Sequence, residues 1–272
     1  MRFLARAKRS PTLLVGAGML TLIIAAAILA PVLATHDPSQ QNLAAILQPP
    51  SGTNWLGTDQ LGRDVYSRML FAARTDLSIA GIAVVTPFVV GVTLGLIAGA
   101  VGGWVDWIVM RLTDTVVAFP FTVIAISISF AVGAGATGIV VAVAYIGWVV
   151  FARVVRGSAL RMRDAGWLAA ARGLGYSPWR ILVRHLLPNV MPQAIVVLMT
   201  ELVVIMVAVA TFGYLGLGVP PPTPDWGTMI SEGQAFVTTK WWIPVIPGLA
   251  VVTCGVALSL TGDGLADVWK VR

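Results

Sequence analysis

Long apolar runs alternate with polar connections along the whole chain. Six runs are long enough to cross a bilayer, because about 20 helical residues span roughly 30 Å of hydrocarbon. They cover residues 13–33, 78–101, 107–131, 137–155, 190–215 and 244–262. The pattern therefore predicts an all-α integral membrane protein with six transmembrane helices.

The polar connections divide the chain into two parts. Residues 1–76 hold a basic N-terminus, the first predicted span and a polar segment on the far side of the membrane. That segment turns amphipathic toward residue 77, which suggests a helix lying on the membrane surface. Residues 77–272 hold the other five spans as a core, with a long basic connection at about 161–189.

The composition is that of a membrane protein, and the sequence lacks the motifs of an ATP, metal or disulfide site. The chain is 57% hydrophobic and 11% charged, with a mean hydropathy of +0.87, which is far more apolar than a soluble domain. The sequence has no Gly-rich loop ending in Gly-Lys-Ser/Thr, so it has no recognisable ATP site of its own. Cys254 has no cysteine partner, and His36 and His185 lack metal-ligand spacing. We expect no catalytic residues, metal or cofactor.

Basic residues indicate the orientation of the spans. Lys and Arg gather before the first span, in the 161–189 connection and at the C-terminus. With six spans these three places lie on one side, and the positive-inside rule makes that side cytoplasmic. Both termini are therefore expected inside, with the first run retained as an anchor rather than cleaved as a signal peptide. The orientation of the spans then accounts for the net positive charge, which gives no reason to expect a nucleic-acid partner.

The 161–189 connection predicts two short helices with a sharp corner. Residues 164–172 favour a helix, and Gly173 and Gly175 allow the positive φ angles that end one. Ser177 is a good N-cap, and Pro178 suits the first helical position. The second helix is expected to run on until Pro188 breaks it. An ordinary basic loop that anchors topology is the alternative reading of these residues.

The same stretch resembles a known family. "AAARGLGYSPWRILVRHLLPN" is similar to the coupling loop of permease subunits of ATP-binding-cassette importers. The family pattern is Glu-Ala-Ala, a glycine a few residues on, and a hydrophobic helix ending in Leu-Pro. Further stretches, "WLGTDQLGRDVYSR" at 55–68 and "YLGLGVPPPTPDWGTMI" at 214–230 among them, resemble the C-type permease of the dipeptide/oligopeptide/nickel group.

The resemblance implies a function, partners and site residues. It implies half of a translocation pathway in a bacterial cell membrane, paired with a homologous sister permease. Two cytoplasmic ATP-binding subunits would dock on the loop, and an extracytoplasmic substrate-binding protein would deliver di- or oligopeptides. The coupling residues implied for this chain are Ala169, Ala170, Ala171, Gly175, Ser177, Pro178, Arg180, Leu187 and Pro188. Ala169 stands where the family has glutamate, which removes one polar contact to the ATPase.

Acidic residues within the spans raise further hypotheses. Glu201 falls near the middle of the fifth span, where an acid costs about 2.5–3.5 kcal/mol on insertion scales. It either lines the pathway and meets a cationic group, or makes a buried structural hydrogen bond. A secondary transporter driven by an ion gradient, with Glu201 as its proton site, is the alternative function. In the third span, Arg111 and Asp114 are expected to form a local ion pair.

Two further patterns concern contacts with other chains or helices. Gly91, Gly95 and Gly99 lie on one face of the second span and favour close approach of another helix. The proline-rich 216–232 loop is expected to meet the binding protein through Thr223, Asp225 and Trp226. Its prolines restrict the backbone and so lower the ordering cost of docking.

Overall fold

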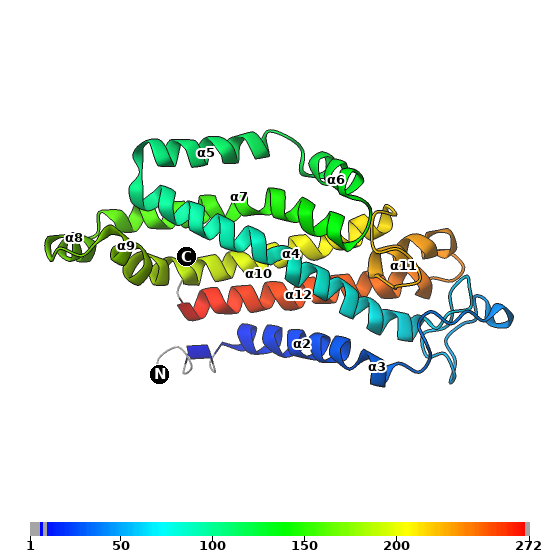
Figure 1. The fold of residues 1–272 in the computed structure, drawn as a ribbon. Coiled ribbons are helices and arrows are strands. Elements are labelled where there is room, and N and C mark those ends of the chain that lie inside the picture. The colour runs from blue at the N-terminus through cyan, green and yellow to red at the C-terminus, as the bar shows by residue number, and fades with distance from the viewer. Residues whose placement is uncertain (1–5, 8–9, 270–272) are drawn as a thin grey trace.

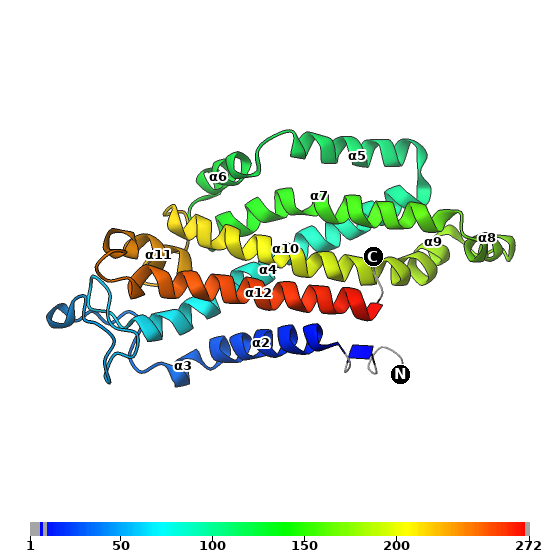
Figure 2. The same ribbon diagram turned by 180° about the vertical axis from the view of Figure 1, so that it is seen from behind.

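The computed structural model describes residues 6–7 and 10–269, and every regular element in this part of the chain is a helix (Figure 1, Figure 2). The long helices are α2 (Pro11–Ile28), α4 (Val65–Val101), α7 (Ala136–Arg163), α10 (Leu187–Tyr214) and α12 (Trp242–Trp269). Shorter elements connect them: α3 (Ala30–Leu33), η1 (Leu43–Ala45), α5 (Gly103–Val117), α6 (Phe121–Val132), α8 (Gly166–Gly173), α9 (Pro178–Ile181), η2 (Leu182–Leu186), α11 (Trp226–Gly233) and η3 (Gln234–Phe236).

The predicted third span is broken. Within the described residues, five helices are long and apolar enough to cross a membrane, and α5 and α6 together make a sixth. The two are bent by 84° relative to each other, so the expected straight span over 107–131 is wrong. Pro120 explains the break, because proline lacks a backbone N–H and disfavours helical backbone at the residue before it. Six spans result only if the bent pair counts as one.

The second span begins earlier than the apolar pattern predicts. The Asp64 side chain caps α4 by accepting a hydrogen bond from the Ser67 backbone N–H, at 2.8 Å. No proline lies between Val65 and residue 77, and the helix continues through Pro87 to Val101. The amphipathic stretch before residue 77 is therefore the first part of α4, and the expected separate surface helix is wrong.

The centre of the bundle is the contact between α4 and α7. Gly91, Gly95 and Gly99 of α4 face α7 directly. A Cβ added to Gly99 would lie 2.6 Å from the Ala159 Cβ, and one added to Gly95 would lie 2.9 Å from the Ala152 Cα. The predicted close helix packing is confirmed, because only glycine allows these backbones to approach so closely.

The bundle has two distinct ends (Figure 1). The end that the sequence predicts to dock on the ATPases, called the coupling end, carries α8 and α9, together with the start of α2 and the end of α12. The opposite end carries α11 and the irregular segment of residues 35–64. This arrangement separates the two predicted docking regions by the whole length of the spans.

Candidate functional site

The corner, residues 166–181, turns as the sequence predicts. The Gly175 backbone N–H donates to the Arg172 carbonyl at 2.9 Å, and the Tyr176 N–H donates to the Ala171 carbonyl at 3.2 Å. This pair of bonds is the Schellman arrangement, which requires left-handed backbone at the residue after the cap. Gly175 has φ 76° and meets that requirement, whereas Gly173 remains helical.

The second helix starts as expected but does not end at Pro188. The Ser177 Oγ accepts from the Arg180 N–H at 3.3 Å, with Pro178 as the first helical residue. The helix then runs through the π-helical turn η2 into α10 without a stop. In η2 the Leu187 N–H donates to the Leu182 carbonyl five residues back. This wider turn accommodates Pro188 in the first turn of α10, so the predicted break is wrong.

Burial divides the corner into an inner and an outer face. Leu168 is fully buried and Ala171 is 5% exposed, whereas Ala169 and Ala170 face outward. At the tip, the exposed residues include two large apolar side chains, Leu174 at 73% and Trp179 at 70%. Arg180 and Pro188 are also exposed, and Leu187 is half-buried. The outer face therefore offers a compact apolar surface with basic residues beside it.

Ring contacts hold the two helices of the corner to η2. Trp167 stacks on His185 with 6.4 Å between ring centroids, and Tyr176 lies 5.6 Å from the same ring. The Arg180 guanidinium lies over the Tyr176 ring at 4.3 Å, a cation–π contact. These contacts connect the corner to η2.

A polar cluster joins α7 to α10 beside the corner. Ser158 is 1% exposed, and its hydroxyl donates to the Gln193 side-chain oxygen. The Arg161 guanidinium donates to the same oxygen at 3.2 Å and to the Ser158 Oγ at 3.1 Å. Sequence reasoning missed this cluster, although Gln193 is a lone amide at the start of an apolar run. It ties together the two spans that flank the corner.

Ion pairs attach α5 to α7. Arg156 donates to the two carboxylate oxygens of Asp106 through its Nε and Nη2, and Asp114 accepts from Arg153 at 2.8 Å. Arg111 instead lies over the Trp107 ring, 5.9 Å from its centroid. The expected local pair between Arg111 and Asp114 is therefore wrong, because α7 supplies basic partners from the facing helix.

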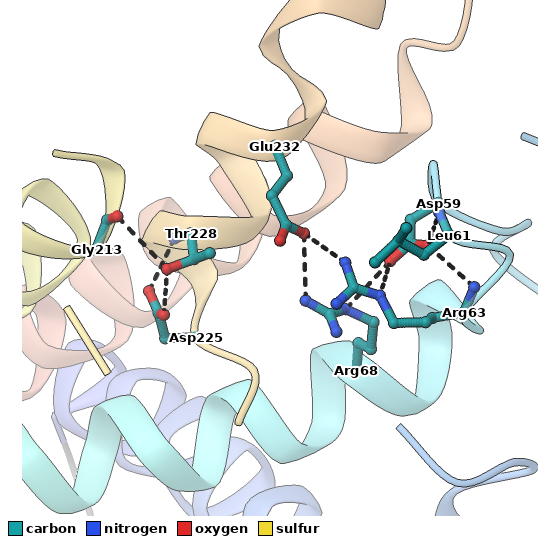
Figure 3. A network of polar contacts seen from close by, with 8 residues as sticks. All are labelled: Asp59, Leu61, Arg63, Arg68, Gly213, Asp225, Thr228 and Glu232. Atoms are coloured by element: carbon teal, nitrogen blue, oxygen red, sulfur yellow. Dashed lines mark hydrogen bonds and ion pairs between the residues drawn. The ribbon is translucent and has the colours of Figure 1, made fainter. Parts of the chain in front are cut away.

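The opposite end holds a charge network that the sequence did not predict. Arg63 donates to Asp59 at 2.6 Å and to Glu232 at 2.7 Å, and Arg68 lies 3.4 Å from the same Glu232 oxygen (Figure 3). Asp59, Arg63 and Arg68 are each less than 5% exposed. The network fastens the 35–64 segment and α4 to α11. The two arginines lie 164 and 169 positions from Glu232, so no local pattern indicates the contacts to α11.

Asp225 and Trp226 have structural roles at the start of α11. Asp225 caps the helix, accepting from the Thr228 N–H at 2.8 Å (Figure 3). Burial raises the pKa of its carboxyl above the ordinary value, and the hydrogen bonds from Thr228 oppose that shift. The Trp226 backbone N–H donates to the Asp76 carboxylate at 3.1 Å. Both residues are 2% exposed, so their side chains offer no docking surface in this conformation. Thr223 is exposed, and its docking role stays a prediction.

Glu201 lies half-buried in α10. Among the described residues its side chain makes no hydrogen bond or ion pair. Its neighbours Thr200 and Val204 are exposed on the surface of the same helix. The position is compatible with a pathway lined by α10, and that role stays a prediction.

Comparisons with known proteins agree with this arrangement. Residues 91–269 match the family described as the inner membrane component of binding-protein-dependent transport systems. Residues 1–50 match the N-terminal transmembrane domain of oligopeptide transport permease C. The chain therefore belongs to the family of inner membrane components of binding-protein-dependent transport systems. It is a multi-pass permease subunit of an ATP-binding-cassette importer.

Named relatives match over nearly the whole chain. The probable D,D-dipeptide transport system permease protein of Escherichia coli is 33% identical, covering 96% of this chain and 88% of its own length. The glutathione transport system permease protein of Pectobacterium atrosepticum is 36% identical, with 93% and 85% covered. A chain in the crystal structure of an amino acid ABC transporter with histidines has TM-score 0.56 and 16% identity, over 75% of this chain and 94% of that one. This last likeness concerns the fold alone.

Proposed function

We propose that the chain forms half of a translocation pathway for di- or oligopeptides and couples it to two cytoplasmic ATPases. A homologous sister permease would complete the pathway, and a substrate-binding protein would deliver the peptide at the opposite end. The names of several relatives specify dipeptides, which supports this substrate class. The observation that carries the proposal is the corner, an exposed apolar surface joined to two spans.

The proposed mechanism is rigid-body leverage. When two ATPases close around ATP, they would draw the corners of the two permeases together. Within this chain, the ring contacts around His185 fix the corner to η2, and η2 continues into α10. The hydrogen bonds among Ser158, Arg161 and Gln193 would make α7 move together with α10. Movement at the corner would therefore tilt both spans and change access to the pathway.

The chain itself would carry out no chemistry in this mechanism. Its sequence contains no phosphate-binding loop, so ATP would be bound and hydrolysed by the partner subunits. The concentration of Lys and Arg at the coupling end supports a cytoplasmic location for that end and for both termini.

Reconstitution tests the proposal. The permease pair should co-purify with two ATPase subunits and take up peptide into liposomes only when ATPases, ATP and binding protein are all supplied. A matched preparation without the ATPases should show no uptake. Uptake driven by a proton gradient without ATP would contradict the proposal and favour a secondary transporter.

A further inference from the structure

A groove lies beside α2, between the places where this helix packs on α12 and on α4, away from both docking regions. Its volume is about 390 Å³, and side chains from α2, α4, α10 and α12 form its walls. The walls are apolar, with Ile24 on α2, Leu202 on α10 and Leu258 on α12. Gly81 lines the α4 side, and a Cβ added there would meet nothing within 4 Å. The space beside Gly81 is therefore open.

Two polar side chains of α4 lie along the same groove. Arg74 and Ser78 line it toward the opposite end of the bundle, and both are exposed. Among the described residues, neither side chain makes a hydrogen bond or an ion pair. A guanidinium at the edge of a membrane span is stabilised when its donors reach an anionic group. The groove thus has apolar walls and a cationic mouth with unused donors.

We propose that this groove, the α2 groove, binds a membrane phospholipid with its phosphate at Arg74 and one acyl chain along the apolar walls. Arginine binds phosphate through two parallel hydrogen bonds, which suits a headgroup held at the mouth. From Arg74 to Gly81 the groove follows seven residues of α4, about 10 Å of helix. That length accommodates a segment of an acyl chain.

The surroundings of the α2 groove favour a lipid over a polar ligand. The helices at its mouth expose large apolar side chains, with Leu22 of α2 at 72% and Ile82 of α4 at 62%. An acyl chain would thus enter from adjoining apolar surface. The bound lipid would fill the space that α2 leaves against the core and fasten α2 to α4. This inference depends on the inner-membrane assignment and is independent of the transported substrate.

Photolabelling tests the proposal. The permease, purified in its natural assembly, is placed in nanodiscs containing phosphatidylethanolamine with a photoreactive group on one acyl chain. Labelled peptides are then identified by mass spectrometry. We expect labelling at Leu202 and Leu258, which line the groove. Gly81→Phe should abolish it by filling the open space. Gly18→Phe is the matched control, because it adds the same side chain at an exposed α2 position with nothing within 4 Å.

The headgroup contact has a separate test. Arg74→Gln should weaken retention of phosphatidylethanolamine and phosphatidylglycerol through a detergent wash by about tenfold, since a charge-assisted hydrogen bond is lost. Arg74→Lys keeps the cation and should retain most of the lipid. Unchanged groove labelling in Gly81→Phe would overturn the proposal. So would cross-linking of the groove residues to a neighbouring subunit in place of lipid.

Discussion

The conformation of Gly175 gives a sharp test of the corner. The Gly175→Val change places a β-branched side chain at φ 76°, where left-handed backbone is rarely compatible with such a residue. A Cβ at this position would meet nothing within 4 Å, so the Cβ adds no clash within the chain. The expected effect is therefore conformational, about 1–2 kcal/mol against the native turn.

That energy translates into weaker docking of the ATPases. A change of about 1–2 kcal/mol lowers the population of the native corner relative to rearranged forms by roughly 5- to 30-fold. The assay titrates ATPase subunits against the reconstituted permease and measures peptide transported per ATP hydrolysed. The six spans should remain inserted, because the corner lies at the end of the bundle.

A neighbouring glycine provides the control. Gly173 also has open space around it but remains in the helical region, so Gly173→Val introduces the same side chain without the left-handed strain. Ala169→Glu, on the exposed face of α8, should likewise have a mild effect. Normal docking and coupling in Gly175→Val would refute the reasoning. Equal damage from Gly173→Val would also refute it, because bulk alone would then explain the effect.

Four other changes have defined outcomes. Gln193→Leu removes the side-chain oxygen that accepts from Ser158 and Arg161 and so joins α7 to α10; the amount of peptide transported per ATP should fall. Gln193→Glu keeps an acceptor for Arg161 and should preserve transport per ATP. Glu201→Gln should reduce peptide uptake with normal assembly, and wild-type uptake and ATPase rates would exclude a pathway role for the charge. Arg63→Met removes the nearer guanidinium from buried Asp59 and from Glu232 and leaves only the longer contacts to Arg68; it should destabilise the protein in thermal unfolding by less than the about 3–5 kcal/mol of a fully broken buried pair. A cross-linker at Thr223 should capture the binding protein in a working complex.

Local features of the sequence predicted much of the fold. Apolar runs located the spans, since hydrocarbon thickness sets their length. The glycines of the second span predicted a close contact with another helix, which the fold makes with α7. Gly175 and Ser177 predicted the corner. Each of these predictions depends on the backbone geometry of a few neighbouring residues. These are properties that a single segment carries by itself.

Features that depend on distant partners could not be predicted. In the sequence, the charges of Arg63 and Glu232 carried information only about membrane topology. The fold places Arg63 Nη2 and Glu232 Oε2 2.7 Å apart. In the sequence, Asp225 and Trp226 resembled loop residues that a partner could reach. In the structure both are buried, and the Trp226 backbone N–H donates to Asp76 of α4. Pro188 looked like a helix breaker because the π-turn before it has no sequence signal.

Site-specific cross-linking at the outer face of α8 tests the central claim most directly. Ala170 is exposed there, so a cysteine at this position should cross-link to an ATPase subunit in the assembled transporter, and ATP should alter the yield. A cysteine in place of Leu168, which is fully buried, is the control and should give no product. Capture of the ATPase from Ala170→Cys is the result we expect. A transporter that works normally without any such product, with its ATPase bound elsewhere on the permease, would contradict the assignment of the corner as the coupling site.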